Sequence, residues 1–590
     1  MHTSPVPLHW DALLWSVMNS KQRFRTRIIL IGIVVAACGL GVSLYNTQIR
    51  RGSEYVAKAQ KQYVKPVSAL VDRGSITFTS KDGTHSTAAT LSANYLIYMN
   101  PKMIKDSQGT YQALSHYLTI NEEQFLKKAA LANDPYEELV KKIEAPLAQQ
   151  VSALSLPGIG VTKEIIRSYP GGSLAAHALG IVGESEGTAG TIEGRYGLER
   201  SYENILSRPH FASSANIFAQ LFTSAHDSVF NADTAHGDIV TTIEPTVQGY
   251  LEKILMKTSN QWKPEEIGGI IMDPKTGDVI ALASLPTFDP NDISKLKSIS
   301  VLSNPLVEHA YEMGSIMKPL TVAIGLDTEV ITPTWTYDDT GTMTLSGKNI
   351  SNFDKKARGP ETPVQEILSQ SLNVGAAAIG LKIGKDNFVR YFSSFGFGAK
   401  TGIEQPNETA GLVANMKTGR DVEIATMAFG QGIALSPIAV TRALATLANQ
   451  GKLVKPRLVQ EINYTDGAQR IIPVDTGVQV LKQESVEEVT RMLVKAVDEA
   501  LRKGEFKMEH YSVAAKTGTA QIADPAARTY YADRYLHSFV AYFPAYDPKF
   551  IIFLYQKYPK STQYASDTLV EPFSELTKFL IDYYNVPPDR

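Results

Sequence analysis

One segment near the N-terminus limits how this chain can fold more than any other feature. Residues 28–45 form an uninterrupted apolar run without a charge. The basic residues just before it are Lys21, Arg23, Arg25 and Arg27. An apolar run of this length is near the lower limit for a helix that spans a bilayer. The basic flank predicts a cytoplasmic N-terminus, so the chain after Tyr45 is expected outside the cytoplasm.

Other interpretations of this run fit the sequence less well. A buried core helix is disfavoured because the run is apolar all round, and a cleaved signal peptide lacks a convincing small-residue site at its end. Val35-Ala36-Ala37-Cys38 resembles a lipoprotein attachment site, but the apolar run continues past Cys38. An uncleaved anchor is therefore the favoured prediction.

The length of the chain sets the expected number of domains. A chain of 590 residues is too long for one hydrophobic core, so at least two domains are predicted. The net charge of -2 gives no general attraction to nucleic acid. The single cysteine, Cys38, excludes an internal disulfide and a Cys-rich metal site, and no histidine cluster suggests zinc. We therefore expect neither a metal nor a cofactor.

Turn signals and apolar patterns divide the rest of the chain in two. Residues 46–235 mix many turn signals with helix-like stretches at 122–132 and 136–143, and predict an irregular, elongated module. Beyond residue 236, strand-like runs near both ends flank alanine-rich helical stretches, which predicts one α+β domain whose sheet is closed by distant segments. The predicted organisation is a cytoplasmic segment (1–27), a transmembrane anchor (28–45), a pedestal (46–235) and a second domain (236–590).

A Ser-x-x-Lys tetrad, Ser315 to Lys318, provides a candidate nucleophile. Residues three apart share a helix face, so the hydroxyl and the amine can meet. A serine needs a neighbouring base, and a lysine serves when burial and nearby cations depress its pKa. Pro319 would leave the Ser315 carbonyl without its helical partner, which places the serine in the first turn of a buried helix. A second tetrad, Ser294 to Lys297, lies in a polar run and is interpreted as a surface turn.

Two further motifs follow. Ser371-Leu372-Asn373 lies in apolar surroundings, where a core polar network and a proton relay with a substrate-amide contact are both compatible with the sequence. Lys-Thr-Gly triplets begin at Lys275, Lys400, Lys417 and Lys516. Only Lys516 follows a strand-like run and is continued by Thr517, Gly518 and Thr519. A lysine cation beside threonine hydroxyls suits a carboxylate ligand, and Gly518 is expected to let a substrate backbone approach closely.

The ordered set of three motifs resembles the penicillin-binding protein and serine β-lactamase superfamily, and their separations look like those of class B penicillin-binding proteins. Tyr311-Glu312-Met313-Gly314-Ser315 is similar to a family motif, with Met313 in place of proline. Upstream, three segments resemble motifs of the class B pedestal: Arg73-Gly74-Ser75-Ile76, Arg167-Ser168-Tyr169-Pro170 and Gly197-Leu198-Glu199. The second motif, with Asn373, is similar to the cell-division, FtsI-like type.

This resemblance implies a transpeptidase-like α+β domain with an antiparallel sheet flanked by helices, on an elongated pedestal. It implies that Ser315 attacks the D-Ala-D-Ala bond of a peptidoglycan stem peptide. The other implied roles are a base, Lys318; a proton relay, Ser371 with Lys516; an amide contact, Asn373; and a carboxylate site, Thr517, Gly518 and Thr519. β-Lactam antibiotics are the implied inhibitors.

The resemblance also implies partners and alternatives. The implied location is the bacterial inner membrane, with a polytopic glycan polymerase and other division proteins as partners. An elongation-type transpeptidase, a D,D-carboxypeptidase, a β-lactam sensor, a β-lactamase and an inactive scaffold are the alternatives. His309, although near Ser315, is interpreted as a surface histidine before the helix.

Overall fold

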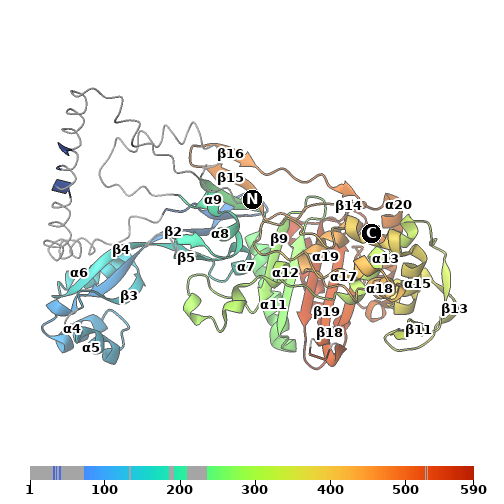
Figure 1. Ribbon diagram of the computed structural model, residues 1–590, viewed down its shortest axis with the longest axis horizontal. Helices are drawn as coiled ribbons and strands as arrows, with labels where there is room; N and C mark the ends of the chain where they lie inside the picture. Colours follow the sequence, from blue (N-terminus) through green and yellow to red (C-terminus); the bar gives the residue numbers. More distant parts are fainter. Residues whose placement is uncertain are drawn as a thin grey trace, which may run out of the picture. The chain divides into compact units, whose positions relative to one another are not determined.

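The computed structural model describes residues 72–131, 134–184, 192–208, 236–524, 526–527 and 529–590, together with residues 31, 32, 35, 39 and 40 (Figure 1). The predicted anchor at 28–45 therefore lies almost wholly outside the described residues, and so does Cys38. Within the described ranges, no helix is both long and apolar enough to cross a membrane.

The chain forms two compact units. Of the described residues beyond position 71, the smaller unit includes those of Tyr95–Glu164, and the larger includes those of 72–94 and Ile165–Arg590. The described helices of the smaller unit are α4 (Ser107–Ser115), α5 (Glu122–Ala129) and α6 (Ala145–Ala153). They surround a core of their own that includes Ile97, Leu114, Phe125 and Val151.

One expected helix in the smaller unit is a strand. The helix-like stretch from residue 122 is confirmed as α5, but residues 136–143 contain the strand β3 (Glu137–Ile143). β3 pairs antiparallel with β2 (His85–Met99), with Ile97 opposite Val140. The pairing overrides the helix propensity of its glutamates, leucine and lysines.

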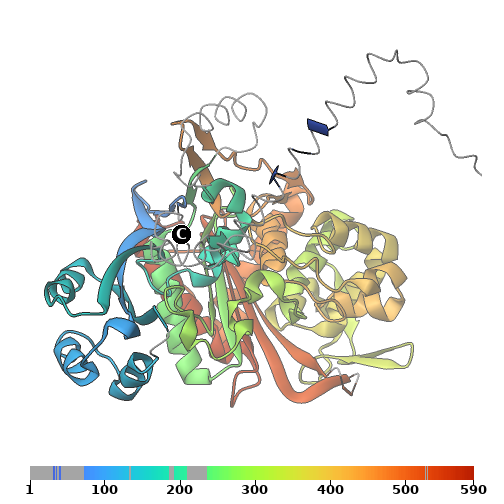
Figure 2. The ribbon, with the colours of Figure 1, turned by 60° about the vertical axis from the view of Figure 1, so that its left-hand side comes forward.

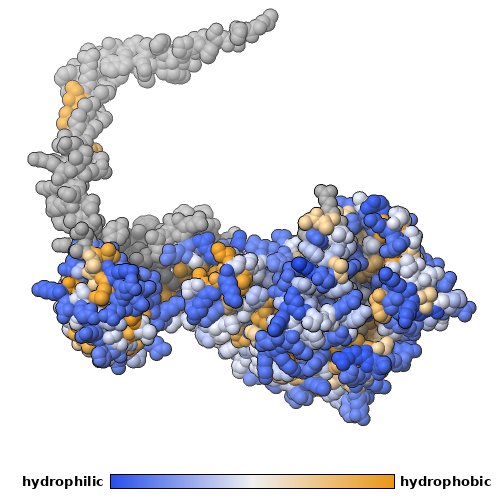
Figure 3. All heavy atoms as spheres, turned by 90° about the horizontal axis from the view of Figure 1, so that it is seen from below, coloured by the Kyte–Doolittle hydropathy of each residue, from blue (hydrophilic) through white to orange (hydrophobic). Residues whose placement is uncertain are grey.

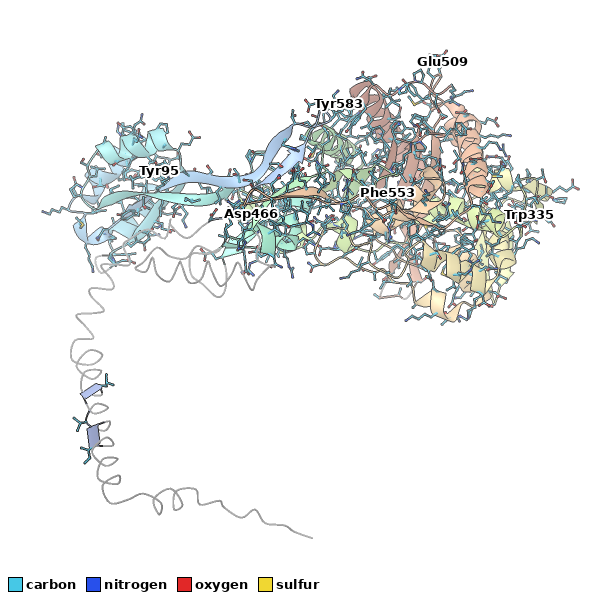
Figure 4. The ribbon with its side chains drawn as sticks, turned by 90° about the horizontal axis from the view of Figure 1, so that it is seen from above. Tyr95, Trp335, Asp466, Glu509, Phe553 and Tyr583 are labelled. Atoms are coloured by element: carbon cyan, nitrogen blue, oxygen red, sulfur yellow. The ribbon has the colours of Figure 1, made fainter. Side chains whose placement is uncertain are left out.

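The larger unit is built on a five-stranded antiparallel sheet in the order β18-β19-β20-β8-β9. Its strands are β8 (Glu266–Met272), β9 (Val279–Leu285), β18 (Ala514–Asp524), β19 (Thr529–Phe543) and β20 (Phe550–Lys557). β8 pairs with β20, so Ile270 lies opposite Phe553 although they are far apart in sequence. Both predicted hairpins and the closure by distant segments are confirmed. Figure 4 shows Phe553 within the body of this unit, where it is fully buried.

Helices cover both faces of this sheet. Alternate residues of each strand point to opposite faces, and two separate apolar cores result. One core includes Ile271 and Phe539 and packs on α11 (Pro245–Trp262) and α22 (Val570–Tyr584). On the other face lie α13 (Lys318–Asp327), α14 (Val364–Ser369), α15 (Asn373–Ile383), α18 (Asp421–Met427), α19 (Pro437–Leu444) and α20 (Gln483–Lys495). Figure 2 shows these yellow and orange helices on one side of the red strands.

A second group of strands ties residues 72–94 to the larger unit. β1 (Ile76–Thr79) pairs parallel with β7 (Gly237–Thr241), and β7 pairs antiparallel with β15 (Val459–Tyr464). β16 (Gln469–Ile471) continues the sheet beside β15. The N-terminal end of the predicted pedestal therefore shares a sheet with segments of the C-terminal domain.

The three upstream motifs meet at one buried carboxylate. Glu199, which is fully buried, accepts hydrogen bonds from Arg73 Nε at 2.6 Å and from Arg167 Nε at 2.7 Å. Tyr169 Oη donates to the same carboxylate at 3.2 Å, and Arg167 Nη1 donates to the Gly74 carbonyl at 2.8 Å. A buried carboxylate needs such partners: Arg73 of the first motif and Arg167 and Tyr169 of the second all donate to Glu199 of the third. These motifs therefore hold the larger unit together.

Candidate active site

Ser315 lies where a tight loop enters a buried helix. It belongs to the 3-10 helix η6 (Gly314–Met317), which continues directly into α13. The Ser315 carbonyl accepts a hydrogen bond from the Lys318 N–H, three residues on, so the tighter turn supplies the partner that Pro319 withholds. The prediction of a serine in the first turn of a buried helix is confirmed, since every residue of α13 is buried.

Glycines allow the loop before the serine to pack closely. Gly314 has a φ of +64°, and its N–H donates to the Gly430 carbonyl at 3.0 Å. Gly430 has a φ of +81°, and a Cβ there would collide with the Gly314 carbonyl oxygen. Because both positions require a conformation that L side chains rarely adopt, they fix the nucleophile loop against the segment around Phe429.

The Lys318 ammonium group lies between the first and second motifs. Its Nζ contacts the Ser371 carbonyl at 2.6 Å, Asn373 Oδ1 at 2.8 Å and Ser371 Oγ at 3.2 Å. The Asn373 amide is oriented by Nδ2, which donates to the Ser351 carbonyl at 2.9 Å. A neutral amine has two N–H donors, which the carbonyl and Oδ1 occupy, and one lone pair, which remains for a hydroxyl proton.

Burial controls the charge of this lysine. Desolvation lowers the pKa of Lys318 well below its usual range, and the nearby Lys516 cation lowers it further. Desolvation also lowers the pKa of Lys516 to about 7. Both effects disfavour the charged form, which is the condition for a lysine to act as a base near neutral pH.

The Ser371 hydroxyl connects the two lysines. Its Oγ lies 2.9 Å from Lys516 Nζ and 3.2 Å from Lys318 Nζ, so the three groups form a continuous chain. Ser371 has a φ of +56°. A non-glycine residue in this region costs on the order of 1 kcal/mol and is concentrated at functional sites. The polar network expected as one alternative for the second motif is present, and it links two amines through the Ser371 hydroxyl.

The third motif lies on the edge strand β18. Thr517 and Thr519 are half-buried on the cavity wall, and Thr519 Oγ1 accepts from the Ala565 N–H at 3.2 Å. At Gly518 a Cβ would collide with Ser538 Oγ and would lie 2.7 Å from the Met313 carbonyl oxygen. The space at Gly518 is therefore filled by the loop before the nucleophile, which is a structural reason for glycine at this position.

A cavity of about 1240 Å³ joins the three motifs. Site residues on its wall are Ser315, Ser371, Asn373, Lys516, Thr517 and Thr519. Ser315 is half-buried there, and its hydroxyl has no hydrogen-bond partner among the residues that the structure describes. An accessible, unengaged hydroxyl one helical turn from a buried lysine of lowered pKa is an arrangement suited to nucleophilic attack.

The competing motifs lie elsewhere. Ser294 donates to Asp292 at 2.6 Å on an exposed 3-10 turn, which confirms the interpretation of that tetrad as a surface turn. Lys275 lies in the hairpin turn and pairs with Asp547, and Lys417 is exposed. His309 is 45% exposed and hydrogen-bonds to Tyr311, as expected for a surface histidine.

Two contacts of the site were not predicted. The segment that ends β12 (Lys348–Ser351) supplies the carbonyl that orients Asn373. Tyr530 Oη, on β19, donates to Glu312 beside the nucleophile loop at 2.9 Å. Neither segment carries a motif, and only long-range pairing brings them to the site, so no local signal could have identified them.

Comparisons with known proteins agree with this geometry. The family described as penicillin binding protein transpeptidase domain matches residues 267–577, and the penicillin-binding protein dimerisation domain matches residues 71–208. The chain is 26% identical over 568 residues to Stage V sporulation protein D of Bacillus subtilis, covering 94% of this chain and 85% of that protein. It is 24% identical over 505 residues to the peptidoglycan D,D-transpeptidase FtsI of Escherichia coli, covering 84% of this chain and 81% of that protein.

Solved structures share the fold. Penicillin-binding protein 2X of Streptococcus thermophilus aligns with a TM-score of 0.69 at 20% identity, covering 88% of this chain and 81% of that chain. Penicillin-binding protein 3 of Mycobacterium tuberculosis, complexed with ampicillin, aligns with a TM-score of 0.66 at 21% identity, covering 88% of this chain and 97% of that chain.

The fold and the three motifs define a transpeptidase-type serine domain joined to a dimerisation-type module. This chain belongs to the penicillin-binding protein transpeptidase family, and it also carries the penicillin-binding protein dimerisation domain. The family predicted from the motifs is confirmed.

Proposed function

We propose that this protein is a peptidoglycan D,D-transpeptidase that cross-links stem peptides through an acyl-enzyme on Ser315, in septal wall synthesis. The observation that carries the proposal is the chain of contacts from Lys318 through Ser371 to Lys516. Ser371 and Lys516 line the same cavity as the unengaged Ser315 hydroxyl, and the fully buried Lys318 contacts Ser371.

The chemistry follows from these groups. Ser315 Oγ attacks the carbonyl between the last two D-alanines while its proton passes to the Lys318 lone pair. The proton then moves through Ser371 to the leaving D-alanine amine as the C–N bond breaks. An amine from a second stem peptide attacks the resulting ester and restores the serine. Backbone N–H groups of Ser315 and Thr519 would stabilise the oxyanion, each by about 3 kcal/mol of barrier.

Substrate placement uses the remaining site residues. Asn373 would hold a substrate amide through its side chain, whose Oδ1 already accepts from Lys318. Thr517 and Thr519, with the Lys516 amine close by, would bind the terminal carboxylate. A β-lactam would acylate Ser315 in the same way and leave slowly, which makes it an inhibitor.

We further propose the organisation predicted from the sequence: a cytoplasmic segment (1–27), an anchor (28–45), a pedestal (46–235) and a transpeptidase domain (236–590). The basic flank of the apolar run supports a single pass with the catalytic domain outside the cytoplasm. A polytopic glycan polymerase and other division proteins are the proposed partners. Asn373 in the second motif and the relatives named FtsI support a division role, which midcell localisation of a fluorescent fusion would test.

Labelling with a fluorescent penicillin tests the nucleophile. Ser315→Ala is expected to abolish labelling, whereas Ser294→Ala, in the exposed tetrad, is the matched control and keeps it. Undiminished labelling of Ser315→Ala would end the assignment. Product analysis with and without an acceptor amine then separates the transpeptidase from a hydrolytic carboxypeptidase.

A further inference from the structure

The cavity around Ser315 is lined by cations and, within the described part of the chain, by no carboxylate. Its basic residues are Lys348, Lys355, Arg502 and Lys516. The proposed function uses Lys516 near the terminal carboxylate of the donor peptide. Three cations therefore remain in a cavity that offers a bound ligand no compensating anion, and such a cavity favours a ligand with more than one negative charge.

Lys348 is carried by a hairpin of defined geometry. β11 (Thr342–Leu345) and β12 (Lys348–Ser351) pair antiparallel, with Leu345 opposite Lys348. The two residues between them, Ser346 and Gly347, have φ values of 47° and 73°. Positive φ at both central positions is the mark of a tight hairpin turn whose twist matches its strands. The hairpin therefore sets the position of Lys348 at the start of β12.

The same segment is fastened to the second motif. Asn373 Nδ2 donates to the Ser351 carbonyl at 2.9 Å, and the Val374 N–H donates to Asn352 Oδ1 at 3.1 Å. Asn352 Nδ2 in turn donates to both oxygens of the buried Asp339, at 2.9 and 3.0 Å. These contacts hold Lys348 and Lys355, on either side of Ser351 and Asn352, along the side of the cavity where Asn373 would hold the substrate amide.

The two lysines differ from Arg502 in having no ionic partner. Both are exposed, and neither ammonium group has an ion pair or hydrogen bond among the described residues. Arg502, in contrast, pairs with Glu505 at 3.2 Å and lies over the Phe506 ring at 5.3 Å. Lys348 and Lys355 are thus the cations of the cavity wall that are available to a ligand.

We propose that Lys348 and Lys355 form a second carboxylate-binding subsite, so that the preferred donor is a stem peptide with a free acidic group upstream of its D-Ala-D-Ala end. The inference rests on the proposed function, since the terminal carboxylate must occupy the Lys516 side for the upstream part to lie along β12. Amidation of the acidic residue removes the negative charge that the two lysines would bind, so an amidated donor should bind less well. Donors with one acidic residue amidated at a time show which carboxylate the subsite binds.

The test measures acylation of Ser315 in the full chain, in detergent. Synthetic pentapeptide donors ending in D-Ala-D-Ala are compared as free acids and with each acidic residue amidated in turn. The free acid is expected to acylate about three- to tenfold faster than the amide that lacks the recognised charge, the range for two exposed lysines acting on one carboxylate. The preference is expected to shrink at 0.5 M salt, which shortens the screening length to about 4 Å.

The Lys348→Gln/Lys355→Gln double variant is expected to bring the ratio of free acid to amide close to one. Lys356→Gln is the matched control, because Lys356 lies in the same loop, is exposed and does not line the cavity. It makes a single change of the same kind and is expected to keep the ratio. Equal rates for both donors in the wild type, or an unchanged ratio in the double variant, would overturn the inference.

Benzylpenicillin separates this failure from failure of the proposed function. If the wild-type chain is not acylated by benzylpenicillin, the nucleophile assignment is wrong. If it is acylated by benzylpenicillin and by both donors at the same rate, the nucleophile stands and the subsite does not. Benzylpenicillin acylation of each variant also reports whether Ser315 is still competent.

Discussion

Replacing Lys516 by methionine should stabilise the protein at neutral pH and destabilise it at high pH. Lys516 is 5% exposed, and burial lowers its pKa from 10.5 to about 7. A pKa change of this size costs roughly 5 kcal/mol of stability while both folded and unfolded states hold the proton, and about 4 kcal/mol at pH 7. Methionine keeps the apolar stem and removes this cost.

The hydrogen bonds that Lys516 makes stabilise the wild-type protein and oppose the gain expected for methionine. Lys516 Nζ bonds to Ser371 Oγ and to the Thr517 carbonyl, both at 2.9 Å. Losing both partners costs about 2 kcal/mol in all. The net expectation at pH 7 is therefore a gain of about 2 kcal/mol for Lys516→Met.

The sign of the pH dependence follows from the two states. Above pH 7 the folded lysine loses its proton, while the unfolded chain keeps it until about pH 10.4. The unfolded state then binds more protons, so wild-type stability rises relative to the variant by about 1.4 kcal/mol per pH unit. The two should be equally stable at about pH 9, and the variant should be the less stable protein at pH 10.

Thermal unfolding of the full chain between pH 7 and pH 10, followed calorimetrically, measures this difference. Lys417→Met is the control, since this lysine also starts a Lys-Thr-Gly triplet but is exposed. It should show no pH-dependent difference from the wild type. A Lys516→Met difference that stays constant from pH 7 to pH 10 would refute the argument that this lysine gives up its proton on folding.

Three other changes test different parts of the structure. Lys318→Arg stays charged and has no lone pair, so labelling by fluorescent penicillin should be lost; wild-type acylation should likewise fall as pH decreases through the depressed pKa of Lys318. Glu199→Gln leaves two buried arginines without their carboxylate and should cost about 3–5 kcal/mol in thermal unfolding. The half-buried Glu193, whose side chain is 37% exposed in its ion pair with Arg195, should cost less than about 1 kcal/mol when changed to Gln. Gly430→Ala should displace the nucleophile loop and slow acylation by about tenfold or more in stopped-flow traces, and an unchanged rate would contradict the close packing.

The parts of the site that were predictable are those with a local signal. The apolar residues after Lys318 predicted a buried helix, whereas the polar run around Ser294 predicted a solvated turn, and the structure confirms both. The two hairpins at the ends of the α+β domain were also predictable from the sequence, because strand-like runs flank clear turn residues. Burial can be predicted from such patterns because it follows the distribution of apolar and polar residues over several neighbouring positions.

The parts that were not predictable depend on distant pairing. β3 has a helix-favouring sequence but is fixed as a strand by β2. The carbonyl of Ser351 that orients Asn373 comes from a hairpin with no chemical motif of its own. No window of sequence contains both partners of either contact, so periodicity and propensity could not give them.

Two features of the site are energetically unfavourable by themselves: the positive φ of Ser371 and the burial of the Lys318 amine. The two meet in one set of contacts. Because the φ of Ser371 is +56°, its carbonyl and its hydroxyl both reach Lys318 Nζ, at 2.6 and 3.2 Å. The carbonyl and Asn373 Oδ1 can accept both N–H groups of a neutral Lys318 amine, which leaves its lone pair for the Ser371 hydroxyl. A relaxed backbone at Ser371 would withdraw that carbonyl and leave Asn373 Oδ1 as the remaining strong acceptor. The strained backbone at Ser371 thus supplies one of the hydrogen-bond acceptors that the buried amine requires.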